Sequence, residues 1–93
     1  MGWTIELGDD AKSELAKLDK AVAKRIYTFL RNRLAKLDDP RAIGAPLRGS
    51  YLGSYWKYRV GDFRIIADIE DQQIRILIIR IGHRSKIYRQ DQA

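Results

Sequence analysis

Cysteine is absent from this chain and histidine and proline are scarce, since the 93 residues include no cysteine, one histidine and two prolines. Without cysteine the chain has no disulfide framework, no thiolate metal site and no cysteine nucleophile. A single histidine also leaves a transition metal with few of its usual protein ligands. We therefore expect neither a bound metal nor a cofactor.

Long hydrophobic runs are missing as well. The longest, Ile76–Ile79, is far shorter than the roughly 20 apolar residues that a membrane helix needs. The start, Met1–Glu6, lacks the basic and apolar regions of a signal peptide. We expect a cytoplasmic protein without membrane contact, and a length of 93 residues predicts a single domain, 1–93, with one core.

Positive charge is concentrated in the second half of the chain. Residues 1–40 carry eight Lys/Arg and seven Asp/Glu, whereas residues 41–93 carry ten and five. The segment Arg80–Arg89 has four Lys/Arg, one histidine and no acid. A solubilising surface would also be basic, but this local concentration, together with interleaved aromatic residues, favours a polyanionic partner, and RNA is the first to consider.

Hydrophobic periodicity predicts a strand and two helices in the first half. Trp3–Leu7 alternates like a strand, and Gly8–Asp10 supplies helix-capping side chains. Leucine and other apolar residues then recur at three- and four-residue steps from Leu15 to Leu37, which indicates an amphipathic helical hairpin broken near Asp19. The second helix should end at Asp38–Pro40, because a proline disfavours helical geometry in the residue before it.

The period changes to two residues from Leu47 onward. We expect strands at Ser54–Val60, Phe63–Glu70 and Ile74–Ile81, with a tight connection at Gly61-Asp62. The last strand is apolar at nearly every position, as expected of a strand covered on both faces. An irregular or helical tail of about eleven residues should follow.

Strand alternation separates a core face from a polar face. Trp56, Tyr58 and Val60 share one face of their strand, and Tyr55, Lys57 and Arg59 share the other. The neighbouring strand places Arg64 opposite its apolar set. Lys57, Arg59 and Arg64 should therefore converge on one surface.

The order of elements predicts an α+β protein with two layers: an N-terminal strand, a two-helix hairpin, three or four antiparallel strands and a short basic tail. This arrangement resembles the RelE toxins of the RelE/ParE superfamily. The resemblance covers nearly the whole chain and is carried by Pro46–Gly49, by Tyr55–Ile66, and by Ile79–Arg84 followed by Tyr88 and Arg89.

The resemblance implies a function and partners. It implies a toxin of a type II toxin–antitoxin system that enters the ribosomal A site, cleaves the messenger RNA there and is neutralised by a small RelB-like antitoxin. RNA carries its own nucleophile, the 2′-hydroxyl, so cleavage needs in-line positioning, a base, charge stabilisation on the phosphorane and an acid for the leaving 5′-oxygen. This chemistry requires no metal.

The same resemblance assigns roles to residues of this chain. Lys57 matches the family lysine that favours deprotonation of the 2′-hydroxyl, and Arg64 matches the arginine that holds the scissile phosphate. Arg84 matches the arginine that stabilises the leaving oxygen, and Tyr88 the tyrosine that stacks on or orients a nucleotide. The residues that we expect to contact RNA are Arg48, Tyr55, Arg59, Lys86 and Arg89.

Two positions depart from the family pattern. Tyr55 stands where the best-known members have a further lysine, and stacking on a base is the alternative role. The segment from Gly82 to Tyr88 is shorter than in some relatives and contains His83, which is either a general acid or base or a loop residue whose ring bonds to the backbone. Arg59 either contacts a phosphate or forms an ion pair with Asp62 or Asp68.

Three functions remain open at this point. The first is the ribosome-dependent messenger RNA endonuclease, favoured by the joint presence of Lys57, Arg64, Arg84 and Tyr88. The second is a ParE-like inhibitor of DNA gyrase, a branch that shares the fold but generally lacks this set of residues. The third is a catalytically inactive module that binds RNA or the antitoxin.

Overall fold

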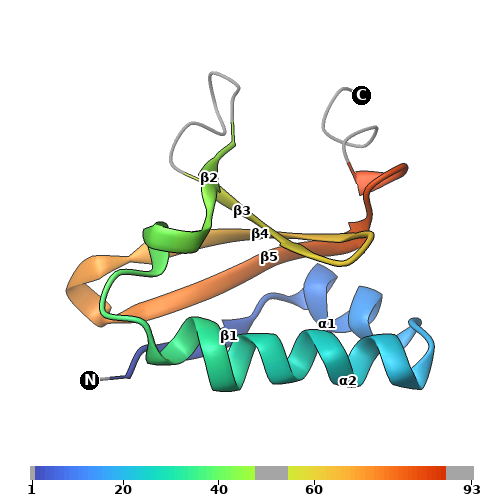
Figure 1. The fold of residues 1–93 in the computed structure, drawn as a ribbon, viewed down its shortest axis with the longest axis horizontal. Helices are drawn as coiled ribbons and strands as arrows, with labels where there is room; N and C mark the ends of the chain where they lie inside the picture. Colours follow the sequence, from blue (N-terminus) through green and yellow to red (C-terminus); the bar gives the residue numbers. More distant parts are fainter. Residues whose placement is uncertain (1, 48–54, 88–93) are drawn as a thin grey trace.

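A five-stranded sheet with two helices on one face forms the protein, as seen in a computed structural model that describes residues 2–47 and 55–87 (Figure 1). The strand order is β1-β5-β4-β3-β2. This two-layer α+β arrangement confirms the predicted fold class. None of the helices in the described residues is long and apolar enough to cross a membrane.

The N-terminal strand β1 (Thr4–Leu7) pairs parallel with the last strand, β5 (Arg75–His83), so that Thr4 lies opposite Arg75. Helix α1 (Asp9–Ala16) follows directly. The predicted break near Asp19 is confirmed, because the Asp19 carboxylate caps helix α2 (Lys20–Thr28) by accepting a hydrogen bond from the backbone N–H of Ala21 at 3.2 Å.

Helix α2 does not end in regular geometry. It continues as a π-helical turn, η1 (Phe29–Arg33), and a 3₁₀ turn, η2 (Leu34–Lys36). A further 3₁₀ turn, η3 (Pro40–Ile43), begins at the predicted proline and leads into the two-residue strand β2 (Ala45–Pro46). The described residues thus contain four strands, β2 to β5, each antiparallel to its neighbour.

Strands β3 (Tyr55–Val60) and β4 (Phe63–Glu70) form the predicted hairpin. Its loop is Gly61-Asp62, and Gly61 has a φ of +60°, a conformation that side chains with a Cβ rarely adopt. The core-facing alternation is also confirmed, since Tyr58 and Val60 are buried and Trp56 packs against the same core.

The start of β5 differs from the prediction. Ile74 was expected to begin the strand, but it follows a 3₁₀ turn, η5 (Asp71–Gln73), with a φ of +49° and is 50% exposed. The reversal from β4 to β5 uses this residue, so the strand begins at Arg75 and extends to His83. Its two faces are covered unequally, because Ile76 and Ile78 are fully buried while the residues between and after them, Leu77 and Ile79, are half-buried.

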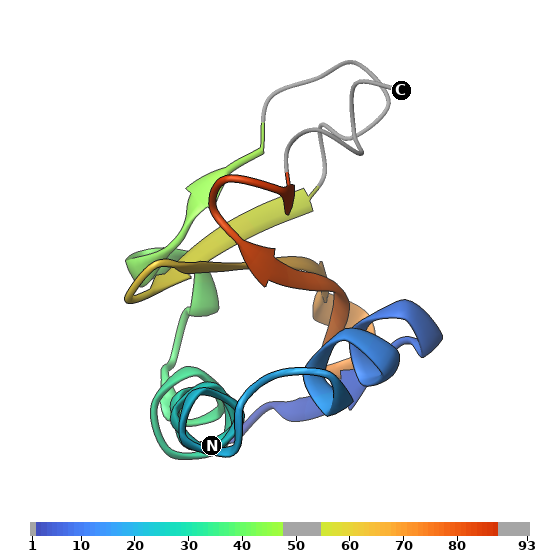
Figure 2. The ribbon, with the colours of Figure 1, turned by 90° about the vertical axis from the view of Figure 1, so that its right-hand side faces the viewer.

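The main core lies between the sheet and the helices, and a smaller apolar cluster lies on the opposite, outer face. Residues Ile26, Leu30 and Leu34 of the helical layer pack against Tyr58, Ile65 and Ile78 of the sheet. The outer cluster consists of Leu47, Ile66 and Ile87, with Tyr55 and Ile79 packed beside it. Ile87 therefore anchors the turn after β5 on the outer face of the sheet. Figure 2 shows this turn on the side of the sheet that faces away from the helices.

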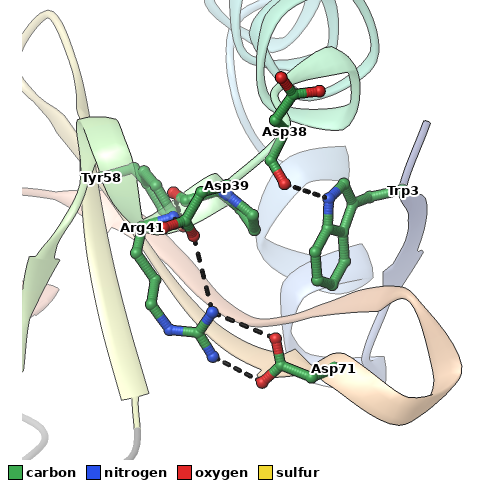
Figure 3. A network of polar contacts seen from close by, with 7 residues as sticks. Trp3, Asp38, Asp39, Arg41, Tyr58 and Asp71 are labelled. Carbon is green, nitrogen blue, oxygen red and sulfur yellow. Dashed lines mark hydrogen bonds and ion pairs between the residues drawn. The ribbon is translucent and has the colours of Figure 1, made fainter. Parts of the chain in front are cut away.

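A polar network ties the segment between the helices and β2 to the sheet (Figure 3). The Tyr58 hydroxyl donates to the carbonyl of Pro40 at 2.7 Å in a buried hydrogen bond. The Arg41 guanidinium binds the Asp71 carboxylate through two hydrogen bonds of 3.1 and 2.6 Å. Trp3 Nε1 donates to the Asp38 carbonyl at 3.4 Å. These contacts hold β2 at the edge of the sheet, beside β3.

Candidate nucleic-acid interface

The predicted cations of β3 and β4 meet in one depression on the outer face of the sheet. This depression, here called the cationic depression, has a volume of about 370 Å³ and is lined by Ile43, Gly44, Ala45, Lys57, Tyr58, Arg59 and Arg64. Its described lining includes three basic side chains and no acidic one. The expected convergence of Lys57, Arg59 and Arg64 is therefore observed, and their roles toward RNA stay predictions.

Arg64 is oriented by the backbone of its own hairpin. Its Nη1 donates to the carbonyl of Phe63 at 3.0 Å and to that of Gly61 at 3.2 Å. A guanidinium has five N–H donors, so these two contacts fix its direction and leave donors for a ligand. Arg59 is the residue directly opposite Arg64 on β3.

Arg59 does not form the ion pair that was considered as an alternative. No ion pair among residues 2–47 and 55–87 involves Arg59 or Arg64. Two arginines therefore occupy opposed positions of β3 and β4, and neither forms an ion pair with a carboxylate of the described residues. Such a pair repels itself and attracts an anion.

Close backbone packing shapes the opposite wall of the cationic depression. A Cβ at Gly44 would lie 2.7 Å from Cε1 of Tyr58 and 3.3 Å from the carbonyl oxygen of Lys57, so this position accepts only glycine without movement. Ala45 follows and lies opposite Lys57 in the β2–β3 register. These two small residues allow β2 to approach β3 while leaving the depression open. Sequence analysis gave Gly44 no such role, because the glycine is explained only by a contact with a distant ring.

Arg84 lies at the hairpin loop. Its backbone N–H donates to the carbonyl of Asp62 at 2.9 Å, which fastens the turn after β5 to the loop between β3 and β4. The Arg84 side chain is exposed, as is that of Lys86, whose backbone N–H donates to the His83 carbonyl at 2.9 Å. Figure 1 shows this turn beside the tip of the β3–β4 hairpin.

His83 is separated from Lys57 and Arg64. It pairs with Phe63 across β4 and β5, and the two rings contact edge to face at 5.5 Å. Since Phe63 packs against the main core, His83 belongs to the helix side of the sheet. There it lines, with Lys86, a second cavity of about 520 Å³ between α1 and the end of β5.

The His83 ring also bonds to the backbone, which was one of the two roles considered for it. Its Nδ1 accepts a hydrogen bond from the Ser85 backbone N–H at 3.1 Å and lies 2.8 Å from the Ser85 hydroxyl. With Nδ1 as acceptor, the hydrogen of the neutral ring is on Nε2. A catalytic role for His83 stays a prediction, and this geometry favours a donor over a base.

The remaining predicted residues are either packed or undescribed. Tyr55 is half-buried beside the outer cluster, so one side of its ring is occupied. Tyr88, Arg48 and Arg89 lie outside the described residues. Sequence analysis also missed Arg25, whose guanidinium lies against Gly61. Asn32 and Arg33 follow Arg25 by seven and eight residues, a spacing that places all three on one face of a helix, and this spacing was the signal available in the sequence.

Comparisons with known proteins agree with the resemblance drawn from the sequence. The family described as ParE toxin of type II toxin–antitoxin system, parDE, matches residues 5–88. Toxin RelE of Mycobacterium tuberculosis is 33% identical over 87 residues, which cover 94% of this chain and 87% of that protein. Toxin RelG of the same organism is 29% identical over 89 residues, which cover 96% of this chain and 99% of that protein.

A solved structure shares the fold as well. The toxin–antitoxin complex RelBE2 from M. tuberculosis contains a chain that matches with a TM-score of 0.82 and 26% identity, covering 92% of this chain and 95% of that one. A solved toxin–antitoxin complex thus contains a chain with the fold of this protein. The chain belongs to the RelE/ParE superfamily of type II toxin–antitoxin toxins.

Proposed function

We propose that this protein is a toxin that cleaves messenger RNA in the ribosomal A site. The observation that carries the proposal is the convergence of Lys57, Arg59 and Arg64 in the cationic depression, with Arg84 fastened to the adjacent hairpin loop. A structural surface gains no stability from placing like charges opposite each other. A site that stabilises a phosphorane needs fixed positive groups around it.

The proposed reaction uses only groups of the RNA, groups of this chain and water. The 2′-oxygen forms a bond to phosphorus, the bond from phosphorus to the 5′-oxygen breaks, and a cyclic phosphate and a free 5′-hydroxyl result. Lys57 favours loss of the 2′-hydroxyl proton to water, Arg64 holds the phosphate oxygens, and Arg84 stabilises the leaving 5′-oxygen, which takes its proton from water. Because these groups are spread over β3, β4 and the turn after β5, the ribosome is needed to hold the RNA in line.

The proposal includes an antitoxin that hides the basic surface. The RelBE2 chain that shares this fold was solved as a toxin–antitoxin complex. An acidic partner segment would complement the cationic depression electrostatically. Hydrogen exchange on the complex tests this directly: protection should appear on β3 and β4, and protection confined to the outer surface of α1 and α2 would contradict occlusion of the site.

A cleavage assay with and without programmed ribosomes tests the chemistry. We expect rapid cutting on translating ribosomes and little on free RNA, and loss of cutting in Arg64→Ala and Arg84→Ala with unchanged circular dichroism. Rapid cleavage of naked RNA at the same protein concentration would contradict the proposal.

The second candidate is gyrase inhibition, which is favoured by the match to a family described as ParE toxin. A supercoiling assay separates the two. Inhibition of supercoiling without any RNA cleavage would replace the first proposal with the second.

A further inference from the structure

A second basic surface lies on the far side of the β3–β4 hairpin, between the hairpin and α2. It is a depression of about 470 Å³, here called the hairpin groove, and its polar lining residues are Arg25, Thr28, Asn32, Arg33 and Arg59. Three of these are arginines, and the described lining contains no acidic side chain. Thr28 and Asn32 add neutral hydrogen-bonding groups between the charges.

The hairpin loop brings arginines from both layers to one peptide. A Cβ built on Gly61 would lie 3.0 Å from Nη1 and 3.5 Å from Cζ of Arg25, so the guanidinium from α2 rests directly against the glycine. On the sheet side, Nη1 of Arg64 donates to the Gly61 carbonyl at 3.2 Å. The positive φ of Gly61 and its missing side chain together make this close approach feasible.

Arg59 joins the two basic surfaces. It lines both the cationic depression on the outer face and the hairpin groove, where it meets the arginines of the helical layer. The two depressions therefore adjoin at Arg59, and together they are here called the basic track, with Lys57 on the sheet at one end and Arg33 at the end of η1 at the other. The π-helical turn that carries Arg33 is a geometry found often at functional sites.

Three arginines along this track have no ion-pair partner among the described residues. Arg25, Arg33 and Arg59 take part in none of the ion pairs formed within residues 2–47 and 55–87. Asp62 is adjacent in the hairpin loop, but it lines neither depression and forms no ion pair in that part of the chain. These three arginines are therefore available to pair with an anionic ligand.

We propose that the hairpin groove binds the phosphate backbone of single-stranded RNA next to the nucleotide held in the cationic depression. This inference rests on the proposed function and extends its substrate contact to a strand several nucleotides long. Planar guanidinium groups fit phosphate oxygens through paired hydrogen bonds, and a strand with regularly spaced charges fits a continuous track better than an isolated anion does. Contacts to the backbone would add affinity without sequence preference.

The test is binding of a labelled 2′-O-methyl RNA of about 12 nucleotides to the full chain, measured by fluorescence anisotropy over a range of salt concentrations. The methylated 2′-oxygen prevents cleavage, so the result does not depend on ribosomes or catalysis. In Arg25→Gln/Arg33→Gln we expect affinity to fall on the order of tenfold and the salt slope to decrease by about 1.4, because two contacts contribute about 0.7 each. Binding of a trinucleotide should not change.

Two control proteins separate a local site from net charge. Lys20→Gln/Lys24→Gln removes the same charge from exposed positions of α2 that line neither depression. Its RNA affinity should stay within about twofold of that of the unmodified chain, because these two lysines lie outside the proposed phosphate contacts. Arg25→Lys/Arg33→Lys keeps the charge and should retain most of the salt slope. Thermal melting followed by circular dichroism checks that each variant is folded.

Several results would overturn the inference while leaving the proposed function in place. Equal losses in the Arg25/Arg33 and Lys20/Lys24 variants would mean diffuse attraction, and equal losses for trinucleotide and long RNA would mean that the groove is not a separate contact. A loss of affinity for polyglutamate with unchanged RNA binding would assign the groove to an acidic protein. Conversely, if the variants change RNA binding as expected but the protein does not cleave messenger RNA on ribosomes, only the proposed function would be overturned.

Discussion

Arg59 and Arg64 stand directly opposite each other on β3 and β4, and neither is paired with a carboxylate in the described part of the chain. Like charges at opposed positions of an antiparallel pair destabilise a sheet. The protein therefore keeps, at the mouth of its proposed site, an arrangement that folding alone would not favour. The same arrangement would be stabilised by a bound phosphate.

Replacing Arg59 with glutamine should stabilise the free protein. We expect the free energy of unfolding to rise by about 0.2–1 kcal/mol, because the repulsion with Arg64 disappears. Urea denaturation of the variant measures this, with Lys24→Gln as a control that removes a charge remote from the pair and should change stability by less than about 0.5 kcal/mol. A loss of stability would instead assign Arg59 a packing role.

The buried Tyr58 hydroxyl should contribute substantially to stability. Tyr58→Phe leaves the Pro40 carbonyl without its donor, so we expect a loss of about 1–3 kcal/mol at neutral pH. Tyr27→Phe is the matched control, because the Tyr27 hydroxyl accepts a hydrogen bond from Arg31 at 2.9 Å on the surface. Equal, small effects in both variants would contradict the assigned importance of the buried bond.

Tyr58 should also make the free energy of unfolding depend on pH at high pH. Burial raises the pKa of Tyr58 to about 12 from the ordinary value of 10.0. The unfolded chain therefore loses this proton first, and the stability contributed by neutral Tyr58 is complete below pH 10 and is lost as pH rises toward 12. The difference in stability between the unmodified chain and Tyr58→Phe should shrink over this range, and a constant difference would contradict the raised pKa.

Glu14 should anchor α1 to β5. Its carboxylate accepts from the Arg80 guanidinium, with the shortest contact at 2.6 Å, and from the backbone N–H of Ile81 at 2.9 Å. Glu14→Gln should cost about 1–3 kcal/mol, because charge-assisted bonds in a half-buried place are weakened. Glu6→Gln, which weakens a more exposed contact with Arg75 at 3.3 Å, should cost less than about 1 kcal/mol. Comparable costs measured by urea denaturation would contradict the anchoring role.

Two aspartates near the β4–β5 turn should have pKa values that are shifted in opposite directions. Hydrogen bonds from Arg41 lower the pKa of Asp71 below 3.8, whereas burial, with the nearby charge of Glu70, raises the pKa of Asp68 above 3.8. The ionised Asp71 carboxylate therefore stabilises the fold above its unfolded pKa, and this stabilisation is lost as pH falls through its lowered folded pKa. The protonated Asp68 carboxyl stabilises the fold below its unfolded pKa, and this stabilisation is lost as pH rises through its raised folded pKa. Carboxyl NMR titration tests both directions, and in Arg41→Gln only the Asp71 shift should disappear.

Periodicity in the sequence was sufficient to predict the layers of this fold. The alternation of Trp56, Tyr58 and Val60 identifies the core face because a β-strand has only two faces. The capping aspartate at the helix break and the Gly61-Asp62 loop are local signals, readable from a few neighbouring residues. No short stretch of sequence indicates that β1 pairs parallel with β5, because this pairing depends on the path of the whole chain between the two strands.

The position of His83 was not predictable for a related reason. A bulge in the β4–β5 pairing lies between Ile66 and Ala67, whose partners are Arg80 and Ile78, so Ile79 is an extra residue on β5. An extra residue changes which side chains after it face the helices. In the aliphatic run Ile76–Ile79 the sequence gives no sign of where such a bulge lies. His83 therefore falls on the side of Phe63 and α1, away from the cations with which sequence analysis had grouped it.

The parallel pairing of β1 with β5 also constrains how the protein folds during synthesis. Strand β1 pairs only with β5, so it cannot join the sheet until the residues near position 75 have been synthesised. Contacts so distant in sequence form late, because the chain must close a long loop first. A nascent chain still held in the exit tunnel therefore lacks the completed sheet and the basic track on it. The proposed site is therefore complete only after β5 has left the tunnel.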